Sequence, residues 1–292
     1  MFAKKKYGIR MKCCVLILAL LWFGSSVDAS IIETFTFETE YQNGKQEIRV
    51  LLPDGYQKDV SYQVLYVLPV EKGFEQKYGY ALGVLKQMGA HNQHNIIIVQ
   101  MGFEKEPWFG DHATNPKIRQ ASYLKEFVVP FIETKYNTMR TSNGRLLFGF
   151  SKSGWGAFSL ILKYPEYFGY AASWDAPITF AKFRFGMKSI YETSDQLALY
   201  RPDLLIPKQN KFFQKMPRLV LTGEKIWSKE TVQTHELLEK NDIKHYYDNT
   251  LIFPHRWDKS WMAPTLSALM DLTTQGKPTS QDAAADIDKP RR

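Results

Sequence analysis

The chain has 292 residues, of which 44% are hydrophobic and 23% charged, and its formal net charge at pH 7 is +8. This length and composition suit one large domain, whose core needs neither disulfides nor a metal for stability. No Lys/Arg block with interleaved aromatic residues occurs beyond residue 29. Nucleic acid is therefore not expected as a partner.

The N-terminus has the pattern of a secretory signal. Five Lys and Arg residues precede an apolar run at 13–24, and Ser-Ser-Val-Asp-Ala follows. This order predicts a signal peptide over residues 1–29, cleaved after Ala29, and an exported protein, either periplasmic or extracellular. The run is short for a membrane span, so no stable span is expected after cleavage; an uncleaved anchor is the alternative.

Removing the signal changes the composition. The segment carries five cations and one anion, which leaves a net charge of +4 for the rest of the chain. Both cysteines, Cys13 and Cys14, also lie in it. The mature chain is therefore expected to have no disulfide, no Cys-zinc site and no thiol catalysis.

The first expected elements are strands. Residues 31–39 and 46–52 alternate in polarity around the turn Gln42-Asn43-Gly44-Lys45, which predicts a hairpin. The apolar runs at 63–68 and 95–99 are typical of strands buried on both faces.

Strands and helices alternate after this hairpin. The further strands are expected at 145–150, 169–174, 218–222 and 244–252, and the helices at 78–88, 121–136 (with a kink at Pro130), after residue 151, 231–240 and 259–272. A polar, aromatic-rich insertion occupies 177–216, and the tail 273–292 has no apolar periodicity and is expected to be disordered. The pattern predicts one α/β domain over 30–272, a mostly parallel sheet between two layers of helices.

One serine lies where a strand turns into a helix. The apolar run 145–150 leads to Ser151, which is flanked by Gly149, Ser153 and Gly154. This resembles the nucleophile elbow of α/β-hydrolases, although G-x-S-x-G would place glycine at 153. The alternative is an ordinary tight strand–turn–helix.

A histidine is expected to activate this serine. In such sheets the chemistry lies beyond the carboxyl ends of the strands, and His255 follows the last expected strand. An imidazole can take and return a proton near neutral pH, which a general base requires. His112 is the only rival, and a surface loop histidine is the alternative.

The acid that would orient the histidine stays open between three carboxylates. The strand at 218–222 is followed by Glu224 and Glu230 but by no aspartate, whereas the strand before it ends in Asp175. Asp175 is favoured because it would lie beside the nucleophile strand, an arrangement that resembles pancreatic-lipase-like enzymes. Otherwise Asp175 would be a turn-forming residue.

Two backbone amides should hold the oxyanion. One is expected from Lys152 and the other from Val70 or Glu71, because Pro69 has no N–H group. Asp111 and His112, after the fourth strand, are expected at the mouth of the site.

Six tryptophans each follow the carboxyl end of an expected strand. They predict an aromatic-walled cleft suited to a sugar face or an aryl acyl group, although core packing explains any single one equally well. The candidates for substrate contact are Trp108, Trp155, Trp174 and Trp257, with Trp227 and Trp261 as the remaining two.

A family resemblance extends over residues 45–272. The segments QVLYVLP, NIIIVQMGF, RLLFGFSKSGWGA, KYPEYFGYAASWDAP, LVLTGEK and HRWDKSW resemble the "putative esterase" branch of the α/β-hydrolases. That branch includes esterase D, feruloyl and acetyl-xylan esterases, enterochelin esterase and mycolyltransferases. The resemblance implies Ser151 as nucleophile and His255 as base. The departures are Ser153, Pro69-Val70 and the missing aspartate after Gly223.

These features together predict an exported serine ester hydrolase. It would act through an acyl-enzyme on Ser151 with a small-molecule or carbohydrate ester as substrate. No cofactor or metal is expected, since glycine-rich phosphate loops and H-E-x-x-H are absent from the sequence. The alternatives are an acyltransferase with the same triad, or an inactive relative that binds a glycan or envelope partner.

Overall fold

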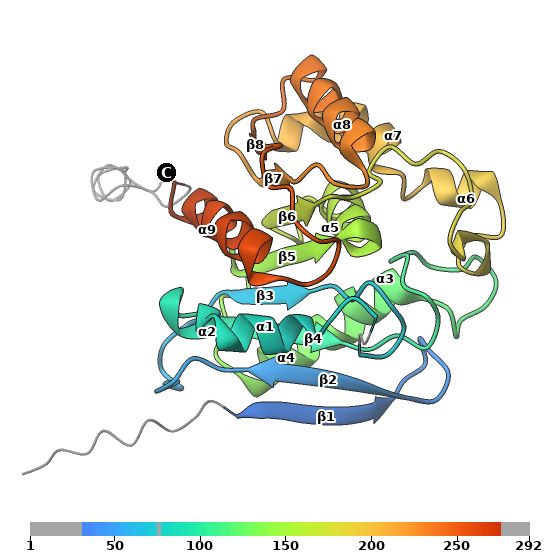
Figure 1. Ribbon diagram of the computed structural model, residues 1–292. Coiled ribbons are helices and arrows are strands. Elements are labelled where there is room, and N and C mark those ends of the chain that lie inside the picture. Colours follow the sequence, from blue (N-terminus) through green and yellow to red (C-terminus); the bar gives the residue numbers. More distant parts are fainter. Residues whose placement is uncertain (1–30, 75–76, 276–292) are drawn as a thin grey trace, which may run out of the picture.

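The computed structural model describes residues 31–74 and 77–275. Their strands form one sheet in the order β1-β2-β4-β3-β5-β6-β7-β8 (Figure 1). The strands are β1 (Ile32–Glu38), β2 (Lys45–Leu51), β3 (Val64–Val67), β4 (Ile97–Met101), β5 (Arg145–Phe150), β6 (Tyr170–Trp174), β7 (Leu219–Thr222) and β8 (His245–Asp248). The first hairpin and the β2–β4 pair are antiparallel, and the other neighbours are parallel.

Helices cover both faces of the sheet. They are α1 (Ala81–Gln87), α2 (Ala90–Gln93), α3 (Gln120–Ser122), α4 (Val129–Lys135), α5 (Ser151–Lys163), α6 (Ser194–Ala198), α7 (Pro202–Gln209), α8 (Ser228–Lys240) and α9 (Lys259–Gln275). Residues of α1 and α9 share one core cluster with one face of the strands, and those of α4 and α5 share a second cluster with the other. The predicted mostly parallel sheet between two layers of helices is confirmed.

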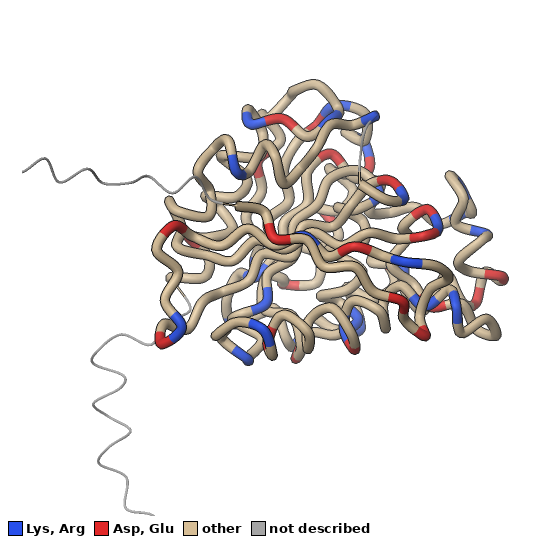
Figure 2. The backbone as a smooth tube through the Cα atoms, turned by 90° about the horizontal axis from the view of Figure 1, so that it is seen from below, with Lys and Arg blue, Asp and Glu red and all other residues tan. Residues whose placement is uncertain are grey.

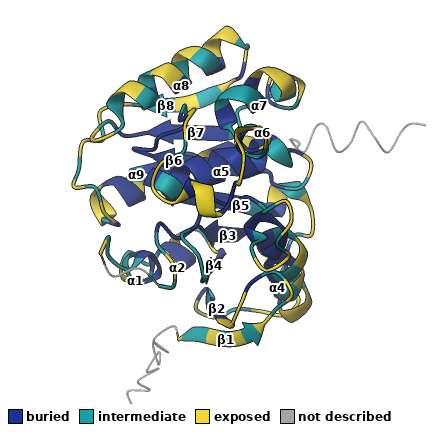
Figure 3. Ribbon diagram, turned by 90° about the vertical axis from the view of Figure 1, so that its right-hand side faces the viewer, coloured by how far each residue is buried: buried dark blue, intermediate teal, exposed yellow. Residues whose placement is uncertain are grey.

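Burial follows the place of each element in the layers. Every residue of β3, β4 and β6 is buried, as expected for parallel strands covered on both faces. The edge strand β1 alternates between half-buried and exposed residues instead. Figure 3 shows α5 almost wholly buried against the sheet, whereas α8 turns an exposed face outward.

The segment predicted as one kinked helix, residues 121–136, is divided into three. A π-helical stretch, Tyr123–Val128, lies between α3 and α4. Pro130 lies in the first turn of α4, where a missing N–H group costs little, so the irregularity precedes the proline. The predicted kink at Pro130 is therefore replaced by a change in helical winding before it.

The boundary of the tail also differs from the prediction. Helix α9 continues through Thr273 to Gln275, three residues past the expected end. Leu272 and Thr273 are both buried, so the last turn of α9 still packs against the domain. The predicted signal peptide and the rest of the tail lie outside the described residues.

The insertion at 177–216 packs against the domain. The Ser159 hydroxyl of α5 donates to the carbonyl of Tyr200 at 2.6 Å, and the Tyr191 hydroxyl donates to the carbonyl of Trp108 at 2.6 Å.

In the part of the chain that the structure describes, none of the helices combines the length and the apolar character of a membrane span. Acidic and basic residues are interspersed along the backbone rather than segregated by sign (Figure 2).

Candidate active site

The serine of the elbow stands at a strained turn in the middle of the sheet. Ser151 is the first residue of α5, directly after β5, and its φ is +51°. A non-glycine residue in this left-handed region costs about 1–3 kcal/mol and persists only where packing enforces it. The turn places Ser151 at the carboxyl end of β5, the position that a nucleophile elbow requires.

Small neighbours are needed because strand and helix nearly touch. A Cβ on Gly149 would lie 2.4 Å from the backbone carbonyl of Ser153, and one on Gly154 would lie 2.4 Å from Ser173 Oγ. Neither position admits a side chain without movement of its neighbours. The two glycines therefore fix how closely α5 approaches β5 and β6.

Ser153, where the motif would have glycine, fits the turn. Its side chain is fully buried and folds back on the residue before Ser151. Its Oγ accepts the N–H of Phe150 at 3.1 Å and donates to the carbonyl of Phe150 at 2.9 Å. The hydroxyl thus satisfies a backbone N–H at the start of the helix, which otherwise has no intrahelical partner.

The imidazole and one carboxylate meet beyond the strand ends. Asp175, directly after β6, has a φ of +41° and is fully buried. His255 comes from the loop between β8 and α9, and its Nδ1 lies 2.7 Å from Asp175 Oδ2. The ring stands edge-on to Phe150 and Tyr78, with centroid distances of 5.1 and 6.0 Å.

The loop after β7 holds this carboxylate in its charged form. Backbone N–H groups of Lys225, Ile226 and Trp227 each donate to Asp175 Oδ1 at 2.9 Å. Burial alone would raise the pKa of Asp175, but the His255 ring and these three amides together lower it below its usual value. A buried carboxylate that stays ionised can orient an imidazole and stabilise its protonated form.

Of the three carboxylates left open by the sequence, only Asp175 is hydrogen-bonded to His255. Glu230 lies in the first turn of α8, and Glu224 precedes the amides that bind Asp175. The loop after β7, which carries the two alternative carboxylates, instead supplies backbone donors to the favoured acid from the neighbouring strand.

One cavity joins the proposed catalytic groups. Its volume is about 580 Å³, and its lining includes Ser151, His255, Lys152 and Val70, which are the expected nucleophile, base and oxyanion donors. The other lining residues are Glu71, Lys77, Tyr78, Glu106, Pro177, Phe185, Gly186, Ile226 and Trp227. The side chain of Lys152 is ion-paired with Glu106 at the cavity wall. A hydroxyl, an imidazole and two backbone N–H groups at one cavity could together attack an ester carbonyl and stabilise the resulting oxyanion.

The predicted tryptophan wall is wrong for four residues. Trp108, Trp155, Trp174 and Trp257 are at most 3% exposed and do not line this cavity. They pack on core aromatics instead; for example, Trp174 stacks on Trp261 with centroids 4.7 Å apart. The alternative reading, core packing, holds for them, and Trp227 is the tryptophan that reaches the cavity.

Asp111 and His112 are not at the mouth of this cavity either. They line a separate one of about 430 Å³. The carboxylate of Asp111 accepts the N–H and the hydroxyl of Ser122 at 3.0 and 2.7 Å, and Nδ1 of His112 accepts the N–H of Asn115 at 3.0 Å. These bonds shape the loop, and they place the rival base His112 away from Ser151.

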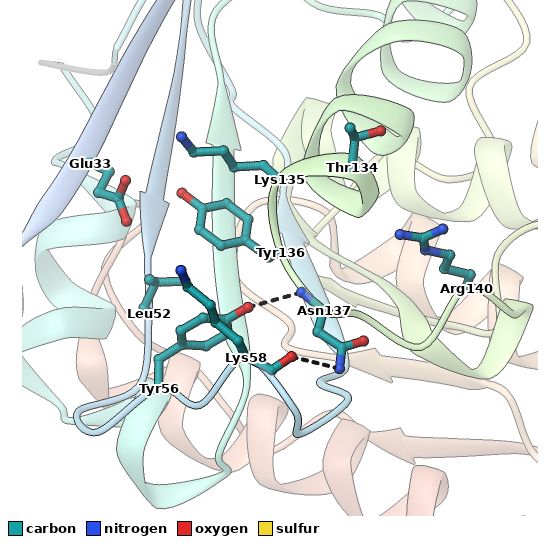
Figure 4. Close-up of a pocket in the computed structure, with 9 residues that line it drawn as sticks. All are labelled: Glu33, Leu52, Tyr56, Lys58, Thr134, Lys135, Tyr136, Asn137 and Arg140. Carbon is teal, nitrogen blue, oxygen red and sulfur yellow. Dashed lines mark hydrogen bonds between the residues drawn. The ribbon is translucent and has the colours of Figure 1, made fainter.

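Another cavity, of about 560 Å³, lies between the β2 end and α4 (Figure 4). Asn137 donates two hydrogen bonds to this region. Its backbone N–H donates to the Tyr56 hydroxyl at 2.9 Å, and its side-chain amide donates to the carbonyl of Lys58 at 3.0 Å. These two hydrogen bonds connect the loop at 56–58 to the loop after α4. Neither Ser151 nor His255 lines this cavity.

Two parts of the site were not predicted from the sequence. The amides of 225–227 are invisible in side-chain patterns, since any residue type can provide them. Phe185 and Gly186, from the insertion, form part of the cavity wall; their φ values are +47° and +84°. The glycine inside an aromatic-rich segment was the available signal for this turn.

The family follows from comparison with known proteins. A sequence model of the family described as "Putative esterase" matches residues 39–259. The chain belongs to this family. A comparison with curated proteins gave no match.

Solved structures share the fold at low sequence identity. A ferulic acid esterase is 15% identical with a TM-score of 0.66, over 84% of this chain and 98% of its own. A fluorophosphonate-binding serine hydrolase F of Staphylococcus aureus is 14% identical with a TM-score of 0.67, over 82% and 98%. An S-formylglutathione hydrolase from Agrobacterium tumefaciens is 13% identical with a TM-score of 0.67, over 84% and 96%. These likenesses confirm the α/β-hydrolase fold, and the family supports a hydrolase of the esterase type.

Proposed function

We propose that the protein is a serine ester hydrolase that forms an acyl-enzyme on Ser151. The observation that carries the proposal is the hydrogen bond between His255 and the buried, ionised Asp175, beside a cavity that also contains Ser151. Membership of an esterase family supports the same reaction class.

The groups act in the order that their positions allow. His255 faces Asp175 through Nδ1, so its Nε2 takes the proton of the Ser151 hydroxyl as the oxygen attacks the ester carbonyl. The alkoxide leaving group receives that proton, which leaves the acyl group on Ser151. Water then attacks the acyl-enzyme with His255 again as base, and the carboxylic acid and free enzyme result.

Backbone N–H groups would stabilise the tetrahedral intermediate. Lys152 is the second residue of α5, where the N–H has no intrahelical acceptor, and the helix dipole favours negative charge there. Val70 lines the cavity from the loop after β3. Its N–H is the proposed second donor.

The cavity favours an ester of moderate size with an apolar acyl part. Phe185, Trp227 and Ile226 supply apolar and aromatic surface, whereas Glu106 and Lys152 supply charge at one side. An aryl or short alkyl acyl group would contact the apolar side chains, and a hydroxylated alcohol such as a sugar would contact the charged pair.

Hydrolysis assays test the activity. Purified wild type should hydrolyse acetyl, butyryl or feruloyl esters, offered with and without a sugar leaving group, and Ser151→Ala should lose nearly all turnover. If the folded wild type hydrolyses none of them yet binds a glycan, and Ser151→Ala binds equally well, the protein is a binding module. Acyl transfer to added glycerol or sugar in preference to water would instead identify a transferase.

We also propose that the protein is exported, because a basic segment, an apolar run and a small-x-small ending precede residue 30. N-terminal sequencing of protein expressed in a bacterial host should find Ser30 as the first residue, in the periplasm or medium. Recovery of the uncleaved chain in the cytoplasm would contradict export.

A further inference from the structure

Two histidines and a glutamate form a cluster on the outer part of the sheet, away from the esterase site. His235 and Glu239 lie one turn apart on α8, and His245 is the first residue of β8 (Figure 1). One potential ligand atom from each of the three lies within 4.8 Å of the others. In the parallel register His245 pairs with Leu219 at the amino end of β7, whereas Ser151 lies beyond the carboxyl end of β5.

The two imidazoles face each other through their nitrogens. Nδ1 of His235 lies 2.8 Å from Nε2 of His245. Nδ1 of His245 lies 2.8 Å from the carbonyl oxygen of Ile243, which can only accept, so that nitrogen carries the proton. Nε2 of His245 is then left with a lone pair directed at His235.

The surroundings hold both rings in place. The side chain of His245 is 1% exposed, and the ring of His235 stacks on Tyr247 with centroids 4.0 Å apart. The bond from His245 to the Ile243 carbonyl is the kind of outer contact that fixes the tautomer of metal-bound histidines and raises their basicity. Glu239 Oε1 lies 3.7 Å from Nδ1 of the His245 ring, and because this side chain is 64% exposed its carboxylate can rotate toward Nε2 of the same ring.

We propose that His235, His245 and Glu239 bind a divalent transition-metal ion of the Zn²⁺ type, with water as the fourth ligand. Imidazole and carboxylate are ligands that zinc accepts in tetrahedral sites. Two nitrogens on one zinc lie about 3.3 Å apart, given bond lengths of about 2.0–2.1 Å, so the rings need to separate by about half an ångström. His235 then carries its proton on Nε2, and no net proton is lost from the neutral ring. The ion would join α8 to the edge strand β8.

Metal titration of the intact mature protein tests the site. After removal of metals with a chelator, wild type should bind one Zn²⁺ per chain by calorimetry, gain several degrees in Tm and give a visible tetrahedral spectrum with Co²⁺. Glu239→Gln and His235→Gln alter exposed or half-buried side chains, so both should fold. Each should weaken Zn²⁺ binding by at least about tenfold, since loss of even an outer contact costs that much.

Glu236→Gln is the matched control, because Glu236 is an exposed carboxylate on the same helix outside the cluster. It should bind Zn²⁺ as wild type does. The proposal is overturned if wild type binds no Zn²⁺ or Co²⁺, or if His235→Gln and Glu239→Gln bind them with unchanged affinity. The readouts do not depend on esterase activity, so Ser151→Ala should bind the metal normally.

Discussion

At the scale of single residues, the proposed site depends on a carboxylate that reaches His255 from the strand next to that of Ser151. Asp175 has no solvent exposure, and its charge is balanced by three backbone N–H groups and the His255 ring. An uncompensated carboxylate would not stay ionised at such a depth. The three amides and the imidazole together therefore keep this buried carboxylate charged.

Asp175→Asn should lower kcat by up to about 10⁴-fold, because an amide NH₂ in place of Oδ2 favours the wrong tautomer of His255. Glu230→Gln and Glu224→Gln should leave kcat near the wild-type value, since neither carboxylate is hydrogen-bonded to the histidine. Steady-state kinetics of the three variants measure this. A larger loss for Glu230→Gln than for Asp175→Asn would transfer the role to Glu230.

The lowered pKa of Asp175 also predicts a dependence of stability on pH. The native state binds this proton less readily than the unfolded chain, so the stabilisation is complete above the unfolded pKa of about 3.9. It is lost as the pH falls through the lower native value. The difference in unfolding free energy between wild type and Asp175→Asn should therefore shrink below about pH 4. Urea unfolding at pH 6, 5, 4 and 3 would show it, and a constant difference would contradict the assignment.

Ser153→Gly would restore the family's motif, but we expect it to reduce stability. It removes the hydroxyl that accepts the buried N–H of Phe150, at a cost of about 1–2 kcal/mol in unfolding free energy. Because Ser153 does not line the cavity, kcat/KM should stay close to wild type. Ser153→Ala, which keeps Cβ, separates the hydroxyl from glycine flexibility. A more active and equally stable Ser153→Gly would show that the serine impairs the elbow.

At the scale of elements, the turn within the insertion contributes the outer wall of the cavity. Phe185 is 57% exposed, and its ring lies 6.2 Å from those of Phe180 and Trp227. The indole N–H of Trp108 donates to the carbonyl of Phe185 at 2.8 Å, and this hydrogen bond holds the turn against the buried core. A tryptophan expected to touch substrate thus supports the wall instead.

Phe185→Ala should raise KM for feruloyl or other aryl esters by about tenfold, since one aromatic contact is worth about 1–2 kcal/mol. Values of kcat, and KM for acetyl esters, should change little, because the catalytic groups are untouched. Tyr246→Ala is the matched control, an exposed aromatic on β8 that does not line the cavity. Equal effects of the two substitutions on KM would exclude Phe185 from substrate contact.

The elements that the sequence predicted best are short, unbroken apolar runs and the strand-to-helix turn, whose patterns have few other interpretations. The apolar runs that became β3 and β4 read as strands buried on both faces, and the elbow gave the strand-to-helix turn at Ser151. The helix at 121–136 was less predictable, because its apolar spacing cannot reveal a π-helical stretch. The end of α9 depended on the burial of Thr273, a tertiary contact.

At the scale of the whole molecule, topology brings together the parts of the site that the chain separates. Ser151, Asp175 and His255 follow β5, β6 and β8, whose carboxyl ends lie at one edge of a parallel sheet. Their order could be predicted and Asp175 was the favoured acid, but Glu224 and Glu230 stayed open because the backbone course of the loop after β7 cannot be read from the sequence. The tryptophans were misread since a strand end can direct a side chain either into the cavity or into the core.

The central claim is that Ser151 is an activated nucleophile. The most direct measurement is labelling of the mature protein with a fluorophosphonate probe, followed by mass spectrometry of the peptides. We predict one adduct, on the peptide that contains Ser151, with none in Ser151→Ala and much slower labelling in Asp175→Asn. Absence of labelling in folded wild type, or an adduct on another serine, would contradict the claim.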